Sequence, residues 1–225
     1  MLRMITALKN IVLPSGPAAR SIRGGLLKGT KMVIDFSSQT QAYLGLQERE
    51  LDPWFKTLSK TINTAVDVGA ADGFYTLYFL CKTNAKKIFA FEPSLHATHP
   101  LRTNIELNSS YPIDRVVVSD RFVSDKDSAT ELRLDSLLPE IVSPCIVKVD
   151  TEGAEKRILT GARALLKQPG IHWIVETHSS ALEKECKALF EEQGYKTTIV
   201  SRAAWRFLLP ELRPADHNRW LIATR

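Results

Sequence analysis

An α/β fold with a doubly wound, mostly parallel sheet is predicted by three observations. Short apolar runs alternate with longer amphipathic stretches from residue 61 onward, a pattern typical of parallel strands with helices on both faces. The chain has 225 residues, 44% of them apolar, which is enough for one domain with its own core. The last two apolar runs, 195–200 and 219–224, have no clear helix between them. This ending predicts a C-terminal antiparallel hairpin.

The elements follow from hydrophobic spacing and from turn residues. Residues 1–30 are rich in Gly and Pro and are expected to be an irregular, basic N-terminal extension, with one domain over 31–225. The predicted strands are 31–36, 65–68, 87–91, 115–118, 145–149, 171–175, 195–200 and 219–224. The predicted helices are 46–60, 74–81, 95–107, 154–167 and 180–193. Gly194 is expected to end the last helix as its C-cap.

Composition limits the function classes. The net charge is +5 and the pI about 9.1, but no RNP, zinc-finger or Arg-rich motif accompanies the charge, so we expect no nucleic-acid partner. No apolar run reaches 18 residues, so no membrane span is expected. Three distant cysteines without CxxC spacing indicate neither a disulfide framework nor a zinc site, and favour the cytoplasm. The acid-poor N-terminus is also compatible with a transit peptide.

A glycine loop follows the first strand of the regular region. Gly69 and Gly73 in VDVGAADGF allow a tight turn and a close backbone approach, and the helix that follows offers its N–H groups to a ligand. The loop is neither GxGxxG nor a P-loop, which disfavours a pyrophosphate. Asp67 leaves a carboxylate at the turn, which suits an ammonium group. A plain strand-to-helix turn is the alternative.

Acidic residues also lie at the carboxyl ends of later predicted strands. Glu92 in FEP lies 25 residues after Asp67, a spacing suited to binding ribose hydroxyls. Asp150 ends the strand at 145–149, and ligands on such sheets bind at strand carboxyl ends. Glu152 and Glu155 lie at a helix start, where simple capping is an alternative to function. His178 follows the strand at 171–175 and is a natural general base, although a lone histidine is often structural.

These motifs resemble a known family. VDVGAADGFYTL, FEP, LDSLLP and KVDTEGAEKRILTGA occur in an order and spacing similar to the FkbM family of S-adenosylmethionine-dependent methyltransferases, over about residues 30–180. The resemblance implies a class I, Rossmann-like fold, with a seven-stranded sheet that ends in an antiparallel hairpin. It also implies O-methylation of a hydroxyl, often on a sugar or a natural product.

The resemblance also assigns roles to residues. Asp67, Gly69 and Gly73 hold the methionine end of the cofactor, Glu92 takes the ribose, and Ser119 and Asp120 lie near the adenine. Asp150 lines the floor of the active site. The predicted cofactor-binding set is Glu48, Asp67, Gly69, Ala70, Ala71, Asp72, Gly73, Glu92, Pro93, Ser119, Asp120 and Asp150. The segment between the third strand and LDSLLP is shorter than in many relatives, and residues 205–217 are expected to shape the acceptor pocket.

The predicted reaction is methyl transfer from S-adenosylmethionine to a hydroxyl-bearing small molecule, such as a saccharide. A hydroxyl is a poor nucleophile and needs a base within about 3 Å; the candidates are Asp150, Glu152 and His178. No metal is predicted, and the oligomeric state is open. Two alternatives remain: a nucleotide- or NAD-dependent Rossmann enzyme, and a methyltransferase-fold binding module without chemistry. Base N-methylation is disfavoured because no Asn/Asp-Pro-Pro-aromatic tetrad occurs.

Overall fold

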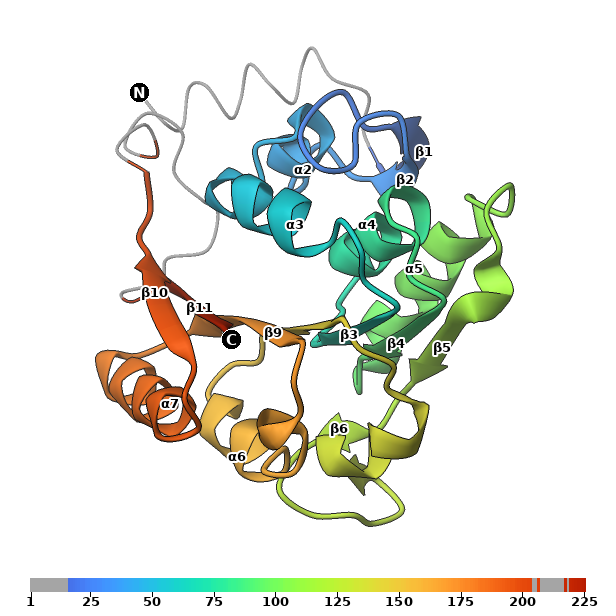
Figure 1. Ribbon diagram of the computed structural model, residues 1–225. Coiled ribbons are helices and arrows are strands. Elements are labelled where there is room, and N and C mark those ends of the chain that lie inside the picture. Colours follow the sequence, from blue (N-terminus) through green and yellow to red (C-terminus); the bar gives the residue numbers. More distant parts are fainter. Residues whose placement is uncertain (1–15, 204–205, 207–216, 218) are drawn as a thin grey trace.

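A seven-stranded sheet organises the protein in the computed structural model, which describes residues 16–203, 206, 217 and 219–225. The strand order is β10-β11-β9-β8-β3-β4-β5 (Figure 1). The strands are β3 (Thr64–Val68), β4 (Lys87–Phe91), β5 (Val116–Ser119), β8 (Cys145–Val149), β9 (Ile171–Thr177), β10 (Lys196–Val200) and β11 (Arg219–Thr224). The pairs within β9-β8-β3-β4-β5 are all parallel. The predicted fold class is therefore confirmed.

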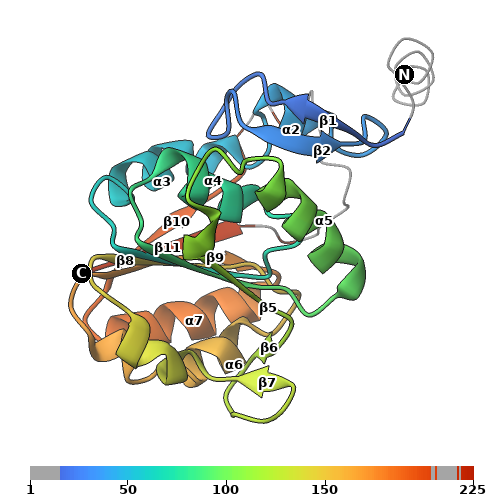
Figure 2. The same cartoon turned by 90° about the vertical axis from the view of Figure 1, so that its right-hand side faces the viewer.

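Helices cover both faces of this sheet (Figure 2). One face carries α3 (Asp52–Leu58), α4 (Phe74–Lys82) and α5 (Leu95–Glu106). The other carries α6 (Glu155–Thr160) and α7 (Ser180–Glu192). Every residue of β3 and β8 is buried, because these central strands face helices on both sides and alternate their side chains between two cores.

The C-terminal hairpin also matches the prediction. Strand β11 lies between β9 and β10 and pairs antiparallel with both. The order of the parallel strands reverses between β3 and β8, which run side by side with Val68 opposite Val149. On such a sheet the crevice at this switch point is the expected place for a ligand.

The N-terminal region differs from the prediction. Residues 1–30 were expected to be irregular, but β1 (Ala18–Ser21) pairs antiparallel with β2 (Lys31–Ile34). Between them Ile22, Leu26 and Leu27 are buried in the core, so this segment gains stability by packing on the helices rather than from local propensity. Residues 1–15 lie outside the described residues. The boundary at residue 30 stays a prediction.

Two predicted helices are shorter than expected. The segment 46–60 forms a 3-10 turn, η1 (Arg49–Leu51), before α3, which has Pro53 in its first turn, a favoured position for proline. The segment 154–167 breaks after α6 at Gly161 and resumes as η4 (Leu165–Lys167). A Cβ at Gly161 would lie 2.0 Å from the Ser124 carbonyl oxygen, so the loop around Ser124 packs directly on the backbone where α6 ends. The short α2 (Thr40–Leu44) was not predicted.

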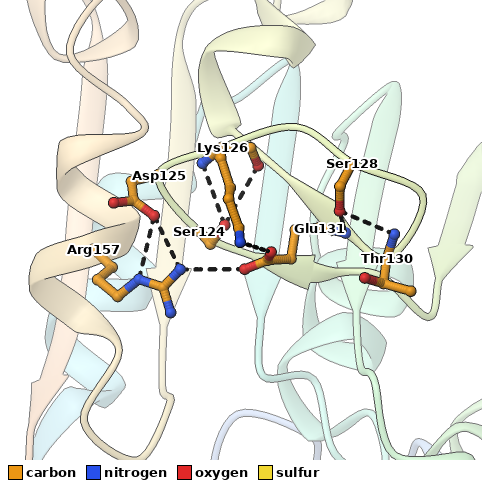
Figure 3. A network of polar contacts seen from close by, with 7 residues as sticks. All are labelled: Ser124, Asp125, Lys126, Ser128, Thr130, Glu131 and Arg157. Carbon is orange, nitrogen blue, oxygen red and sulfur yellow. Dashed lines mark hydrogen bonds and ion pairs between the residues drawn. The ribbon is translucent and has the colours of Figure 1, made fainter.

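After β5 the chain forms a small separate sheet outside the main one. Strands β6 (Phe122–Val123) and β7 (Glu131–Leu132) form a two-stranded parallel sheet, and the 3-10 turns η2 (Ile113–Arg115) and η3 (Leu134–Glu140) flank β5 and this sheet. Arg157 of α6 bonds Asp125 Oδ1 through Nε at 3.2 Å and Nη2 at 3.0 Å, and Glu131 Oε1 at 3.2 Å (Figure 3). Lys126 Nζ lies 2.8 Å from Glu131 Oε2. We call Asp125, Lys126, Glu131 and Arg157 the Arg157 network.

The helices and the cysteines bear on two further sequence predictions. None of the helices among the described residues has the length and apolar character needed to cross a membrane. The three cysteines are free thiols, and Cys145 and Cys186 are buried. The absence of a disulfide framework is thus confirmed.

Candidate active site

The carboxyl ends of β3, β4 and β8 meet at one point. The backbone N–H groups of Gly69 and Ala70 both donate to the Phe91 carbonyl, at 2.9 and 3.0 Å. Gly69 has φ +79°, and a Cβ there would lie 1.9 Å from the Asp150 carbonyl oxygen. Only glycine permits both this backbone conformation and this approach. The predicted glycine loop therefore joins the ends of the three strands.

Glu92 holds the glycine loop in place. Its Oε2 accepts from the backbone N–H of Ala71 at 2.9 Å and its Oε1 from that of Ser94 at 2.8 Å. Ala71 has φ +47°, an unfavourable conformation for a residue with a Cβ, and strain of this kind clusters at functional sites. Gly73, with φ +94°, is the N-cap of α4. These hydrogen bonds hold the glycine loop in one conformation. Its N–H groups and the carboxylate of Glu92 then lie together at the carboxyl end of the strands.

Asp67 is buried and incompletely bonded. Its Oδ2 accepts from the Thr76 hydroxyl at 2.6 Å, whereas Oδ1 has no hydrogen-bond partner among the described residues. Burial raises the pKa of this carboxyl to about 6, although the Lys148 ammonium opposes the shift. A buried oxygen without a partner is costly, and a ligand that donates a hydrogen bond would remove that cost.

Lys148 lies at the centre of the buried charges. It is 1% exposed, its Nζ lies 2.8 Å from Asp150 Oδ2, and it is 4.7 Å from the centre of the Tyr75 ring. The surrounding acids, Asp150 first among them, raise the pKa of this amine although burial lowers it. Asp150 accordingly has a lowered pKa, since this ammonium outweighs the burial of the carboxyl.

Glu48 reaches this group from the segment before β3. Its Oε2 accepts from the Tyr75 hydroxyl at 2.5 Å, and its backbone has φ +42°. Arg206 fixes the next turn, with Nε 2.9 Å from Glu50 Oε1 and Nη2 2.7 Å from Glu50 Oε2. Of the segment predicted to shape the acceptor pocket, only Arg206 and His217 lie within the described residues.

A corner of three side chains forms where β8 and β9 end. The distances from His178 Nε2 are 3.8 Å to Asp150 Oδ1 and 3.9 Å to Glu176 Oε1. Burial first, and then the charge of Asp150, raise the pKa of Glu176 to about 9. The other ring nitrogen, Nδ1, lies 2.6 Å from Glu155 Oε1. We call Asp150, Glu176 and His178 the acid–histidine corner.

Sequence reasoning missed Glu176. Strand β9 extends to Thr177, two residues beyond the predicted strand, so Glu176 belongs to the strand and is 5% exposed. The Trp220 indole Nε1 donates to its Oε2 at 3.3 Å. The sequence did offer one indication of its role. Glu176 directly follows the apolar run 171–175, and an acid at such a position is rarely buried without a partner or a function.

The remaining predicted residues lie around this edge. The Ser119 carbonyl accepts from the Glu92 N–H at 3.0 Å, so β5 also reaches the site. Asp72 Oδ2 accepts a hydrogen bond from the side-chain amide of Gln39 at 2.6 Å. This bond links the glycine loop to the segment before β3. Asp120 and Glu152 are exposed. Pro93 follows Glu92 at the end of β4 and is half-buried.

The acid–histidine corner also has the composition of a metal site. One ligand atom from each of its three residues lies within 4.8 Å of the others. However, the Lys148 ammonium already contacts the second oxygen of Asp150, and a divalent ion there would be repelled by this buried positive charge. The geometry therefore favours proton transfer over metal binding, and the absence of a metal stays a prediction.

The chemistry of the donor set fits a cationic cofactor. Asp67 offers a buried oxygen that no other described residue bonds, and the acid Glu92 lies at the neighbouring strand end, next to the glycine loop. S-adenosylmethionine carries an ammonium group, a sulfonium and a ribose, which match these acids. A pyrophosphate would meet repulsion from Asp67 and Asp150 instead.

Known proteins resemble this chain in sequence and in fold. The Methyltransferase FkbM domain matches residues 109–209, somewhat less than half of the chain. A crystal structure of Methyltransferase FkbM from Methylobacillus flagellatus is similar at a TM-score of 0.59 and 16% identity, covering 72% of this chain and 43% of that one. The chain thus spans less than half the length of that protein. The resemblance to the FkbM family is confirmed.

Two other structures share the fold. TYW2 of M. jannaschii, in complex with AdoMet, has a TM-score of 0.53 and 13% identity and covers 94% of this chain and 86% of its own. Precorrin-6y C5,15-methyltransferase from Geobacter metallireducens has a TM-score of 0.51 and 12% identity, covering 80% and 88%. None of the curated proteins matches the chain. The class I methyltransferase fold is therefore confirmed.

Proposed function

We propose that this chain, which has the class I methyltransferase fold and resembles the FkbM family, uses S-adenosylmethionine to methylate a hydroxyl of a small molecule such as a saccharide. The observation that carries the proposal is the acid-lined edge where β3, β4 and β8 end. There a buried Asp67 oxygen lacks a hydrogen-bond partner within the described part of the chain, and the glycine loop lies against Asp150.

The chain supplies binding and orientation. Asp67 and the glycine loop hold the methionine end of the cofactor, and Glu92 holds the ribose. Ser119 and Asp120 lie on the adenine side, and Glu48 approaches from the segment before β3. When bound, S-adenosylmethionine supplies a methyl group whose bonding electrons stay on sulfur after transfer. The protein then has to orient the acceptor and to exclude water.

The acceptor hydroxyl has to lose its proton, and three candidates were predicted to take it. Asp150 is a weak base because the Lys148 ammonium lowers its pKa, and Glu152 is exposed. His178 has a raised pKa, owing first to its hydrogen bond with Glu155, and it borders the corner through Nε2. His178 is therefore our preferred general base.

We propose a small molecule, and not a nucleic acid, as the methyl acceptor. The corner and its surroundings are lined by carboxylates, which repel phosphates, whereas hydroxyl groups donate hydrogen bonds to carboxylates. We also propose a cytoplasmic location, supported by the three free thiols.

Thermal unfolding with S-adenosylhomocysteine tests the proposal. At 100 times its dissociation constant the ligand stabilises by about 2.7 kcal/mol, which for this size raises Tm by roughly 5–11 °C. We expect this rise to disappear in Asp67→Asn and in Glu92→Gln. It should persist in Glu140→Gln, because Glu140 is exposed and pairs only with Lys87 among the described residues.

The alternatives give different results. A Tm rise with NADH and none with S-adenosylhomocysteine would support a dinucleotide enzyme and end the methyltransferase proposal. Binding of S-adenosylhomocysteine without methyl transfer to any of a panel of saccharides and polyols would favour a binding module.

A further inference from the structure

The ring of His178 lies between acids on both sides. Nδ1 lies 2.6 Å from Oε1 of Glu155, the first residue of α6, which is 0% exposed. Nε2 faces Asp150 Oδ1 at 3.8 Å and Glu176 Oε1 at 3.9 Å. The two nitrogens therefore differ: one is hydrogen-bonded and the other is not bonded to either acid.

This geometry locates the ring proton. A carboxylate only accepts hydrogen bonds, so the short contact with Glu155 requires that Nδ1 carries the proton. The neutral ring then presents its lone pair at Nε2. Distances of 3.8 and 3.9 Å exceed those of a hydrogen bond, yet they leave room for one oxygen atom to contact Nε2 and a carboxylate together.

We propose that Glu155 is a positioning residue that fixes the Nδ1–H form of His178, so that Nε2 accepts the proton of an acceptor hydroxyl bound beside Asp150 and Glu176. This inference rests on the proposed function. The hydroxyl proton passes to Nε2 while the hydroxyl oxygen takes the methyl group, and the electron pair of the broken sulfur–carbon bond stays on sulfur. The imidazolium formed is stabilised by the carboxylate of Glu155.

The burial of Glu155 supports this role over simple helix capping. Its Oε1 also lies 3.3 Å from the backbone N–H of Gly153, at the limit of a hydrogen bond, and its Oε2 has no partner among the described residues. A carboxylate needed only as a cap would gain its dipole energy while exposed to water. Burying it costs free energy, which the short bond to the ring offsets.

Among the described residues, four acids face His178. They are Glu155 of α6, Asp150 at the end of β8, Glu152 in the turn before α6, and Glu176 of β9. The hydrogen bond with Glu155 is the largest cause of the raised pKa of His178; burial opposes it, and the charges of Asp150, Glu155 and Glu152 add to it, so these three acids favour the protonated ring. Since this folded-state pKa lies above 6.5, the ring becomes a free base only as pH rises through the raised value.

Nitrogen-15 NMR of the histidine side chains tests the inference on the full chain saturated with S-adenosylhomocysteine. The chain has five histidines, and loss of one ring signal in His178→Asn assigns His178. We expect Nδ1–H as the neutral form in the wild type. In Glu155→Gln the pKa of His178 should fall toward its ordinary value, and in Glu155→Ala the Nδ1–H form should no longer dominate.

Glu185→Gln is the matched control. Glu185 is an exposed acid of α7 that pairs with Lys156, the residue after Glu155, so its removal should leave the ring signals of His178 unchanged. A purely structural role of Glu155 would change Tm but not the dominant tautomer. A neutral Nε2–H ring in the wild type would overturn the inference even if no Glu155 variant folds.

Two further measurements separate the remaining outcomes. Magnesium or zinc ions added to the sample should leave the Nε2 signal unchanged; a shift reversed by a chelator would make Nε2 a metal ligand and overturn the inference. Calorimetric titration with S-adenosylhomocysteine tests the proposed function separately. Failure to bind ends that function whatever the tautomer, whereas binding with the wrong tautomer ends only the role of Glu155.

Discussion

Two charge clusters in this protein lie on neighbouring elements but differ in balance and burial. The Arg157 network has two cations and two acids, and its members have exposed or partly exposed side chains (Figure 3). The cluster around Lys148, which we call the buried cluster because Lys148, Asp67, Glu155 and Glu176 are buried in it, contains more acids than bases. Its other members are partly exposed. Its acids are Glu48, Asp67, Asp150, Glu155 and Glu176, and its bases are Lys148 and His178.

The pKa values of two acids in the buried cluster, Asp67 and Glu176, set it apart from the Arg157 network, although the pKa of Asp150 is lowered. In the Arg157 network, hydrogen bonds from Arg157 and Lys126 lower the pKa of Asp125 and Glu131, which is ordinary for solvated ion pairs. In the buried cluster, burial raises the pKa of Asp67 to about 6 and that of Glu176 to about 9. Excess buried acid destabilises the free protein, and groups perturbed in this way mark functional sites.

The largest effect is expected when the buried ammonium of Lys148 is removed. Lys148→Met leaves Asp150 without the ammonium that contacts it, and breaking a buried ion pair on one side costs about 3–5 kcal/mol. The loss should be greatest at high pH and smaller at low pH, where the acids take up protons. Chemical denaturation at several pH values measures it.

Lys126→Met is the matched control, because Lys126 pairs with Glu131 at the surface. We expect no measurable change in stability for this variant at any pH. Equal losses for the two lysines would mean that burial does not distinguish the clusters.

A smaller effect with the opposite sign is expected at Glu176. Its folded-state pKa of about 9 exceeds the ordinary 4.5, so its contribution to stability is complete below pH 4.5 and is lost as pH rises through about 9. Glu176→Gln keeps an acceptor for the Trp220 indole and removes this loss. The Tm of the variant should therefore exceed that of the wild type increasingly from pH 5 to pH 9, by roughly 2–4 °C per kcal/mol gained.

Glu131→Gln supplies the contrast, since the pKa of Glu131 is lowered rather than raised. This variant should show no gain in Tm at high pH. If Glu176→Gln also shows no gain in Tm at high pH, ionisation of Glu176 does not destabilise the folded protein. The two clusters would then not differ in the way proposed.

Much of the site was predictable because strand ends mark it. Asp67, Glu92 and Asp150 each lie at or just after the end of a short apolar strand, and parallel strands bring such ends to one edge. Gly69 was predicted as a tight turn, and the 1.9 Å approach of its missing Cβ to the Asp150 carbonyl gives the physical reason. The C-terminal antiparallel hairpin was predicted on a different ground, because no clear helix separates the last two apolar runs.

Other features depend on tertiary contacts that no local pattern shows. The Glu155–His178 bond joins residues 23 apart, and the Arg206–Glu50 pair joins residues 156 apart. Lys148 lies in an apolar strand, so its charge was visible, but three of its acid neighbours, Glu48, Asp67 and Glu176, come from other segments of the chain. The strand β2 was predicted, but β1 and its pairing with β2 were missed, because a turn-rich sequence conceals a strand that is stabilised by packing.

The smallest effect is expected at Arg157, although it makes more ion pairs than Lys148 does. Arg157→Ala removes its contacts with Asp125 and Glu131, but Lys126 still pairs with Glu131, and water solvates the freed Asp125. We expect no measurable change in Tm or in binding of S-adenosylhomocysteine, both read from the same melting curves. A clear loss of binding would instead show that the Arg157 network orders the segment after Ser119, and would place that segment within the cofactor site.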